Sequence, residues 1–142
     1  MEEYEQKVEQ NQKRNKKYIK EFTEWLNEKG LSKKTIRKHL DNVKLYINEY
    51  LNYYDVIKVE DGIEEVDDFL EGWFIEKCLF AIKTSLKETA ASLKKFYQYM
   101  SEYNYVKKED YKQLCSIIKD NMDIYLEQLE AFDNGIYYDI WA

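Results

Sequence analysis

Residues 32–54 read SKKTIRKHLDNVKLYINEYLNYY and contain the clearest helical pattern of the chain. From Ile36 to Tyr54, apolar side chains recur every three or four positions, which is the spacing of one buried helix face. Ser32 stands just before this pattern, where its hydroxyl can accept a hydrogen bond from the first turn. We therefore expect a helix that begins directly after Ser32.

A second amphipathic pattern lies upstream, from Tyr18 to Leu26, and Gly30 supplies its C-terminal stop. The residues before it, 2–17, are polar except for Tyr4 and Val8. They form either a solvated helical extension or a frayed tail, and the pattern does not decide between the two.

Downstream, residues 66–74 predict a third amphipathic helix, which continues to Ile82 as a more uniformly apolar stretch and forms the buried centre. Ser85 with Glu88 three positions later is the pattern of a capping box, so a fourth helix is expected to begin at Ser85. Residues 55–62 alternate briefly between apolar and polar. We expect a connector there, because one short strand has nothing to pair with.

A fifth helix is expected from about Lys108 to Phe132, ending near Gly135. The chain contains no proline and four glycines, so little interrupts helical hydrogen bonding. These features favour an all-α fold, a compact bundle of four to five helices in a single domain over residues 1–142. Within it, residues 1–16 are frayed or extend the first helix, and residues 107–142 add a C-terminal helix and tail.

Charge is unevenly distributed along the chain, whose 22 basic and 28 acidic residues give a net charge of -6. From Lys13 to Lys44, eleven basic residues face four acidic ones, a local charge of about +7. Residues 59–142 carry nine lysines and 18 acids, a local charge of about -9. The molecule should therefore have one basic end, which is the candidate binding surface.

Catalytic groups are sparse. His39 is the only histidine and stands one position from the apolar stripe of its helix, so we interpret it as a surface or boundary residue. Cys78 and Cys115 are 37 positions apart with no metal-ligand spacing, and we interpret both as small core residues. The acids between Glu64 and Glu71 fit the first turns of a helix, where they complement its dipole. No glycine-rich phosphate loop is present. We expect no enzyme activity, metal or cofactor.

Three segments resemble the SAM-like core-binding domain of phage integrases and tyrosine recombinases. They are FTEWLNEKGLSKKTIRKHL at residues 22–40, VDDFLEGW at 66–73 and SLKETAASLKKFYQYM at 85–100. The resemblance covers roughly residues 18–106. In that family a bundle of four or five helices clamps one face of DNA through its second and fourth helices. The resemblance implies that this chain contacts a duplex mainly at its backbone. The implied contacts are Ser32, Lys33, Lys34, Thr35, Lys38, Lys87, Thr89, Ser92 and Lys95.

The chain also departs from that family. Catalytic recombinases carry several arginines, a His-x-x-Arg element and a nucleophilic tyrosine in a second domain. Here the only arginines are Arg14 and Arg37, and Leu40, Asp41 and Asn42 follow His39. The resemblance therefore implies a non-catalytic DNA-binding module.

An alternative is a helical protein-interaction module with no nucleic-acid role. It would bind a partner, or a second copy, through the apolar tail residues Tyr137, Tyr138, Ile140 and Trp141. No run approaches the roughly 20 apolar residues of a membrane span, and the first five residues are too charged for a signal peptide. We expect no membrane association and a cytoplasmic location.

Overall fold

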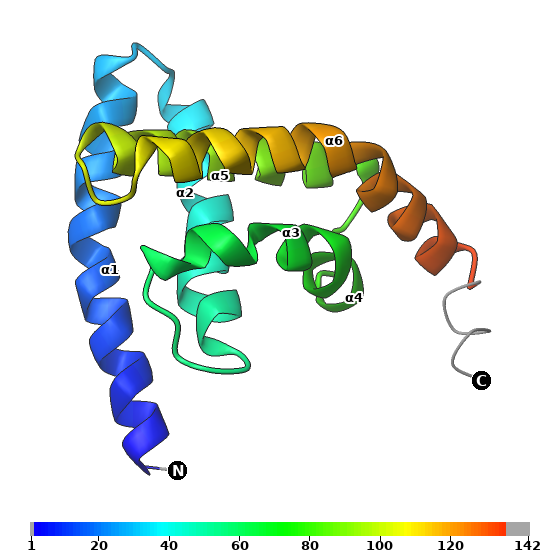
Figure 1. The fold of residues 1–142 in the computed structure, drawn as a ribbon, viewed down its shortest axis with the longest axis horizontal. Coiled ribbons are helices and arrows are strands. Elements are labelled where there is room, and N and C mark those ends of the chain that lie inside the picture. Colours follow the sequence, from blue (N-terminus) through cyan, green and yellow to red (C-terminus); the bar gives the residue numbers. More distant parts are fainter. Residues whose placement is uncertain (1, 136–142) are drawn as a thin grey trace.

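The computed structural model describes residues 2–135, and every regular element among them is helical (Figure 1). The expected all-α bundle is confirmed. Within this range no helix combines the length and the apolar character needed to cross a bilayer. The tail residues Tyr137, Tyr138, Ile140 and Trp141, to which a partner contact was assigned, lie outside the described residues.

The first helix, α1, spans Glu2–Glu28, so residues 2–17 are a helical extension rather than a frayed tail. Gly30 has φ +78°, a left-handed conformation that glycine adopts without strain, and it ends α1 as predicted. Helix α2, Lys33–Lys44, then begins after Ser32. It continues through a π-helical turn, η1 (Leu45–Glu49), and a 3₁₀ turn, η2 (Tyr50–Asn52).

The third predicted helix is built from four short pieces: η3 (Asp61–Glu65), α3 (Val66–Asp68), the π-helical turn η4 (Phe69–Trp73) and α4 (Phe74–Lys77). Its apolar residues up to Cys78 are buried as expected, except for half-buried Trp73. The predicted continuation to Ile82 is wrong, because Cys78 is extended and Leu79, Phe80 and Ile82 are exposed. The chain must turn there to enter the next helix, so consecutive apolar side chains cannot all face the core.

Helix α5, Lys83–Glu102, is the centre of the bundle and packs against α1, α2 and α6. It begins two residues before the predicted Ser85 start. Ser85 instead occupies the third helical position, where its hydroxyl accepts a hydrogen bond from the Ile82 N–H at 2.9 Å. The sequence pattern therefore located the helix start correctly to within one turn but assigned the wrong residue as its cap.

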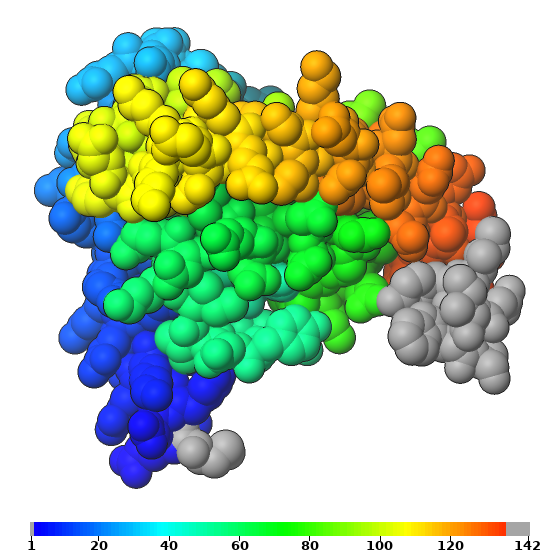
Figure 2. All heavy atoms as spheres, in the orientation of Figure 1, coloured from blue at the N-terminus to red at the C-terminus, as the bar shows by residue number. Residues whose placement is uncertain are grey.

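Helix α6, Lys108–Asp133, crosses in front of α5 in Figure 1, with the short helices η3 to α4 beneath it. Gly135 follows with φ +76°, which agrees with the predicted end. Helix α1 lies along one side, and its C-terminal half reaches the α5 side of the core through Phe22, whose ring meets Phe96 edge-on at 5.2 Å. The N-terminal end of α1 extends past the rest of the molecule (Figure 2).

Candidate nucleic-acid interface

Helices α2 and α5, which carry the contacts that the family resemblance implies, lie against each other. His39 Nδ1 is 2.7 Å from Ser92 Oγ, and Asn42 Nδ2 donates to the same oxygen at 3.0 Å. Ser92 is fully buried, so these bonds form the floor of the seam between the two helices. Lys38 precedes His39 on one side of the seam, and Lys95 follows Ser92 by three residues on the other.

His39 is half-buried at this seam, in agreement with its interpretation as a boundary residue. Burial lowers its pKa first, and the positive charge of Lys95 lowers it further, whereas Glu88 acts in the opposite direction. The neutral ring is therefore favoured at pH 7. The His39–Ser92 contact places Lys95, three residues further along α5, close to α2.

The N-terminus of α2 presents its cations to solvent. Lys33, Lys34 and Lys38 are exposed. The Ser32 hydroxyl accepts a hydrogen bond from the Thr35 N–H at 3.2 Å and lies 3.0 Å from the Thr35 hydroxyl. The Ser32 hydroxyl thus caps the helix, and Thr35 is half-buried while Ser32 remains exposed.

Two of the implied DNA contacts on α5 are not available to a duplex. Thr89 and Ser92 are both 0% exposed, whereas Lys87 is exposed and Lys95 half-buried. The prediction for Thr89 and Ser92 is wrong because α5 is covered by α1, α2 and α6 and therefore buries more than a single stripe. Ser92 acts in the α2–α5 contact instead.

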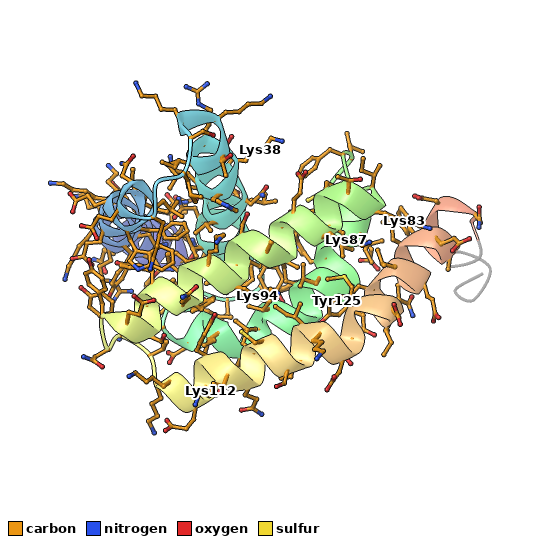
Figure 3. The ribbon with its side chains drawn as sticks, turned by 90° about the horizontal axis from the view of Figure 1, so that it is seen from above. Lys38, Lys83, Lys87, Lys94, Lys112 and Tyr125 are labelled. Carbon is orange, nitrogen blue, oxygen red and sulfur yellow. The ribbon has the colours of Figure 1, made fainter. Side chains whose placement is uncertain are left out.

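Sequence reasoning missed other cations on this side of the bundle. Figure 3 looks onto α2, α5 and α6 together and labels Lys38, Lys83, Lys87, Lys94 and Lys112, which come from these three helices. Lys112 was overlooked because α6 is acidic as a whole. Its first half nevertheless carries the lysines, up to Lys119, and five acids without a base follow from Asp120 to Asp133. This separation within the helix was the available signal.

Acidic side chains also lie on these helices. Asp41 on α2 and Glu88 on α5 are both exposed, and Glu88 acts on His39 at the seam. The surface is therefore a mixed one with an excess of lysines. Such a surface attracts phosphates weakly and with strong dependence on salt.

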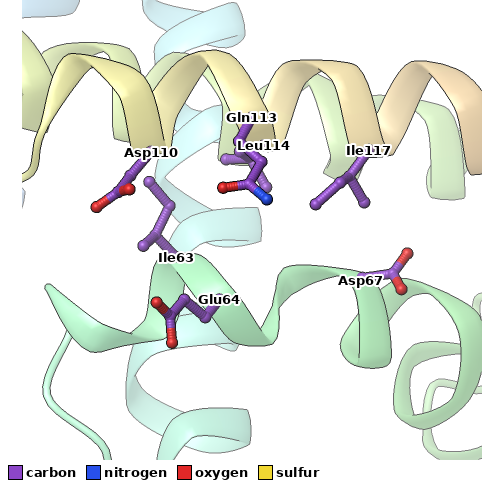
Figure 4. A pocket seen from close by; sticks show the side chains of 7 residues that line it. All are labelled: Ile63, Glu64, Asp67, Asp110, Gln113, Leu114 and Ile117. Carbon is purple, nitrogen blue, oxygen red and sulfur yellow. The ribbon is translucent and has the colours of Figure 1, made fainter.

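A separate cleft between α6 and the η3–α3 segment has the opposite character (Figure 4). It encloses about 230 Å³ and is lined by Ile63, Glu64, Asp67, Asp110, Gln113, Leu114 and Ile117. Asp67 accepts hydrogen bonds from Asn121, at 3.0 Å, and from the Tyr125 hydroxyl. With three carboxylates at its walls, this cleft repels phosphate.

Burial holds the Cys78 thiol protonated, since it raises the pKa to about 11, and Cys115 is half-buried. Among residues 2–135, no group of three histidine, cysteine, aspartate or glutamate side chains is arranged to hold a metal ion. Comparison of the chain with protein-family models, curated proteins and solved structures finds no match.

Proposed function

We propose that the chain is a non-catalytic DNA-binding module that contacts the duplex backbone through basic residues of α2 and α5. The observation that carries the proposal is the α2–α5 seam, where Lys38 and Lys95 flank His39 and Ser92. Lysines from both helices can therefore meet the same stretch of phosphates. Exposed Lys33, Lys34 and Lys87 extend the surface along the two helices.

The proposal includes the SAM-like arrangement of integrase core-binding domains, in which the second and fourth helices clamp DNA. Helices α2 and α5 of this chain correspond to those two helices in the sequence resemblance. The missed cation Lys94 on α5 adds to the proposed surface, and buried Thr89 and Ser92 are removed from it.

Binding to a mixed-sequence duplex, measured by fluorescence anisotropy at about 50 mM salt and then across a salt titration, tests this function. Log K falls linearly with log salt, and each lost phosphate contact lowers the magnitude of that slope by about 0.9. Lys38→Ala with Lys95→Ala should therefore lower the magnitude by about 1.8. The matched control, Lys77→Ala with Lys108→Ala, removes the same charge elsewhere and should leave the slope unchanged. Absence of binding by the unmodified chain at about 50 mM salt would exclude the proposal.

A helical protein-interaction module is the second candidate function. The observation that favours it is the loop after α4, where Leu79 is fully exposed and Phe80 and Ile82 are also exposed. Consecutive exposed apolar side chains are typical of interfaces. If a second copy covers them, sedimentation will show a concentration-dependent dimer that Phe80→Ser abolishes, and a monomer at all concentrations would contradict it.

A further inference from the structure

A groove between the N-terminal half of α1 and the loop after η2 contains a second group of cations. It has a volume of about 500 Å³ and is lined by Lys7, Gln10, Lys13, Arg14, Val56 and Lys58. Four of these six side chains are cationic and none is a carboxylate.

Folding, and not helical spacing alone, assembles this group. Lys58 belongs to the loop, and buried Asn11 ties that loop to α1 by donating to the Ile57 carbonyl at 3.0 Å and to Asn52 Oδ1 at 2.9 Å. The cation of the loop is therefore held beside those of the helix. If the lysines of α1 were only a solvated helix face, no loop cation would need to be held beside them.

Arg14 is also held in position. Its Nη2 donates to Asn11 Oδ1 at 2.8 Å, and Asn11 is 1% exposed. The buried amide thus binds the loop through its nitrogen and orients the guanidinium through its oxygen. This hydrogen bond uses one of the five N–H donors of a guanidinium, whose planar fork suits phosphate oxygens.

Three acids near the groove do not line it. Asp55 accepts a hydrogen bond from the Val56 N–H at 2.8 Å but is not among the lining residues. Glu3 pairs with Lys7 at 3.6 Å, but both side chains are largely exposed, and ion pairs of this kind contribute little and exchange readily. Glu60 lies by Tyr18, one turn further along α1 from Arg14, and is not among the lining residues. Mutual repulsion among the four cations therefore favours an anionic ligand.

The shape of the group favours a chain of phosphates over a single small anion. Lys7 and Arg14 are seven residues apart, which is about 10 Å along a helix axis. One strand of B-DNA carries a phosphate about every 3.4 Å of its axis, so about three phosphates match this length.

We infer that the groove of Lys7, Lys13, Arg14 and Lys58 binds the phosphate backbone of nucleic acid as a second contact, separate from the α2–α5 surface. The inference rests on the proposed DNA-binding function. Arg14 binds phosphate oxygens from a fixed position, and the lysines supply the remaining charge.

The full chain with a duplex of about 20 base pairs tests the inference by the same anisotropy and salt titration. Lys13→Ala with Lys58→Ala should reduce the salt slope by about 1.8, whereas Lys77→Ala with Lys108→Ala should not change it. Lys13 and Lys58 are exposed, so their removal leaves the fold intact, which circular dichroism verifies. If the unmodified chain binds DNA and the groove variant keeps its slope, the groove inference fails while the α2–α5 proposal stands.

Nuclear magnetic resonance provides an independent readout. Duplex addition should shift the Arg14 Nε–H signal and the Asn11 side-chain amide signal, because the two groups are bonded to each other. Unchanged signals at saturating duplex would overturn the inference. The same shifts produced by inorganic phosphate alone would also overturn it, since they would indicate a site for one small anion. Failure of the unmodified chain to bind duplex would instead refute the proposed function itself.

Discussion

The two halves of α1 attach to the rest of the molecule by different chemistry. The C-terminal half buries Phe22, Trp25 and Leu26 against the aromatic side of α5. The N-terminal half buries Asn11 and Asn15, both 1% exposed, against η1, η2 and the following loop. A buried helix face can thus be made of amides, and hydrophobic periodicity detects only the C-terminal half of α1.

The contacts of Asn15 are made to the π-helical turn η1. Asn15 Nδ2 donates to the Ile47 carbonyl at 3.1 Å and to Asn48 Oδ1 at 3.0 Å, and Gln12 donates to the Asn48 carbonyl at 3.3 Å. A π-helical turn departs from the regular i→i−4 bonding of an α-helix, and here its carbonyls accept side-chain donors. Each bond contributes modestly when made, but a buried partner left unpaired costs much more.

The largest expected effect comes from breaking the aromatic half with Phe22→Ala. Phe22 is fully buried and contacts Phe96 and Tyr99, so its removal leaves a cavity in the main core. The free energy of unfolding should fall by about 3–5 kcal/mol in urea denaturation. Glu24→Ala, an exposed change on the same helix, is the control and should cost less than about 0.5 kcal/mol. A loss below about 1 kcal/mol for Phe22→Ala would contradict the aromatic attachment.

Breaking the polar half with Asn11→Ala should have a smaller and more local effect. The variant leaves the Ile57 carbonyl and Asn52 Oδ1 without this donor, which costs about 1–3 kcal/mol. Hydrogen exchange should accelerate in residues 2–16 while the amides of α5 keep their protection, because the aromatic core is intact. Gln10 is exposed on the same half of α1, so Gln10→Ala is a suitable control and should leave the exchange unchanged. Uniform acceleration over all helices would show that the two halves are not separable.

The comparison also explains how much of the fold the sequence could predict. Helices that bury apolar stripes, such as α2 and α6, were located from periodicity with ends marked by Ser32 and Gly135. The extension over residues 2–17 was left undecided because asparagines facing solvent and asparagines facing carbonyls look alike in a sequence. The predicted burial of Leu79 and Phe80 was wrong because apolar character alone does not show where the chain turns.

The candidate sites show the same limit. Charge counting identified the cations of α2, and the family resemblance implied those of α5. The resemblance also implied DNA contacts at Thr89 and Ser92, which α1, α2 and α6 enclose. The groove at Arg14 could not be predicted, because Lys58 reaches it only through the loop that Asn11 holds. Tertiary neighbours decide both outcomes, and one sequence does not contain them explicitly.

The smallest effect is expected from Glu21→Gln. This variant tests whether a titratable group stabilises the aromatic C-terminal half of α1. Glu21 Oε1 accepts hydrogen bonds from the hydroxyls of Tyr99, at 2.7 Å, and Tyr105, at 2.9 Å. The Tyr99 bond is the main cause that lowers the pKa of Glu21 below its ordinary value of 4.5; burial opposes it, and Tyr105 and Lys17 assist it. A glutamine oxygen still accepts both bonds, so the loss at pH 7 should be about 1 kcal/mol.

The dependence on pH distinguishes this group from the asparagines. Because the pKa of Glu21 is lower in the folded chain, its contribution is complete above the unfolded value of about 4.5 and is lost as pH falls toward the folded value. In urea denaturation from pH 7 down to about pH 3.5, the difference between the unmodified chain and Glu21→Gln should therefore shrink. The cost of Asn11→Ala should stay constant over the same range, since an amide does not titrate. A difference for Glu21→Gln that is equally independent of pH would mean that its charge does not stabilise the aromatic half, and that both halves rely on neutral contacts.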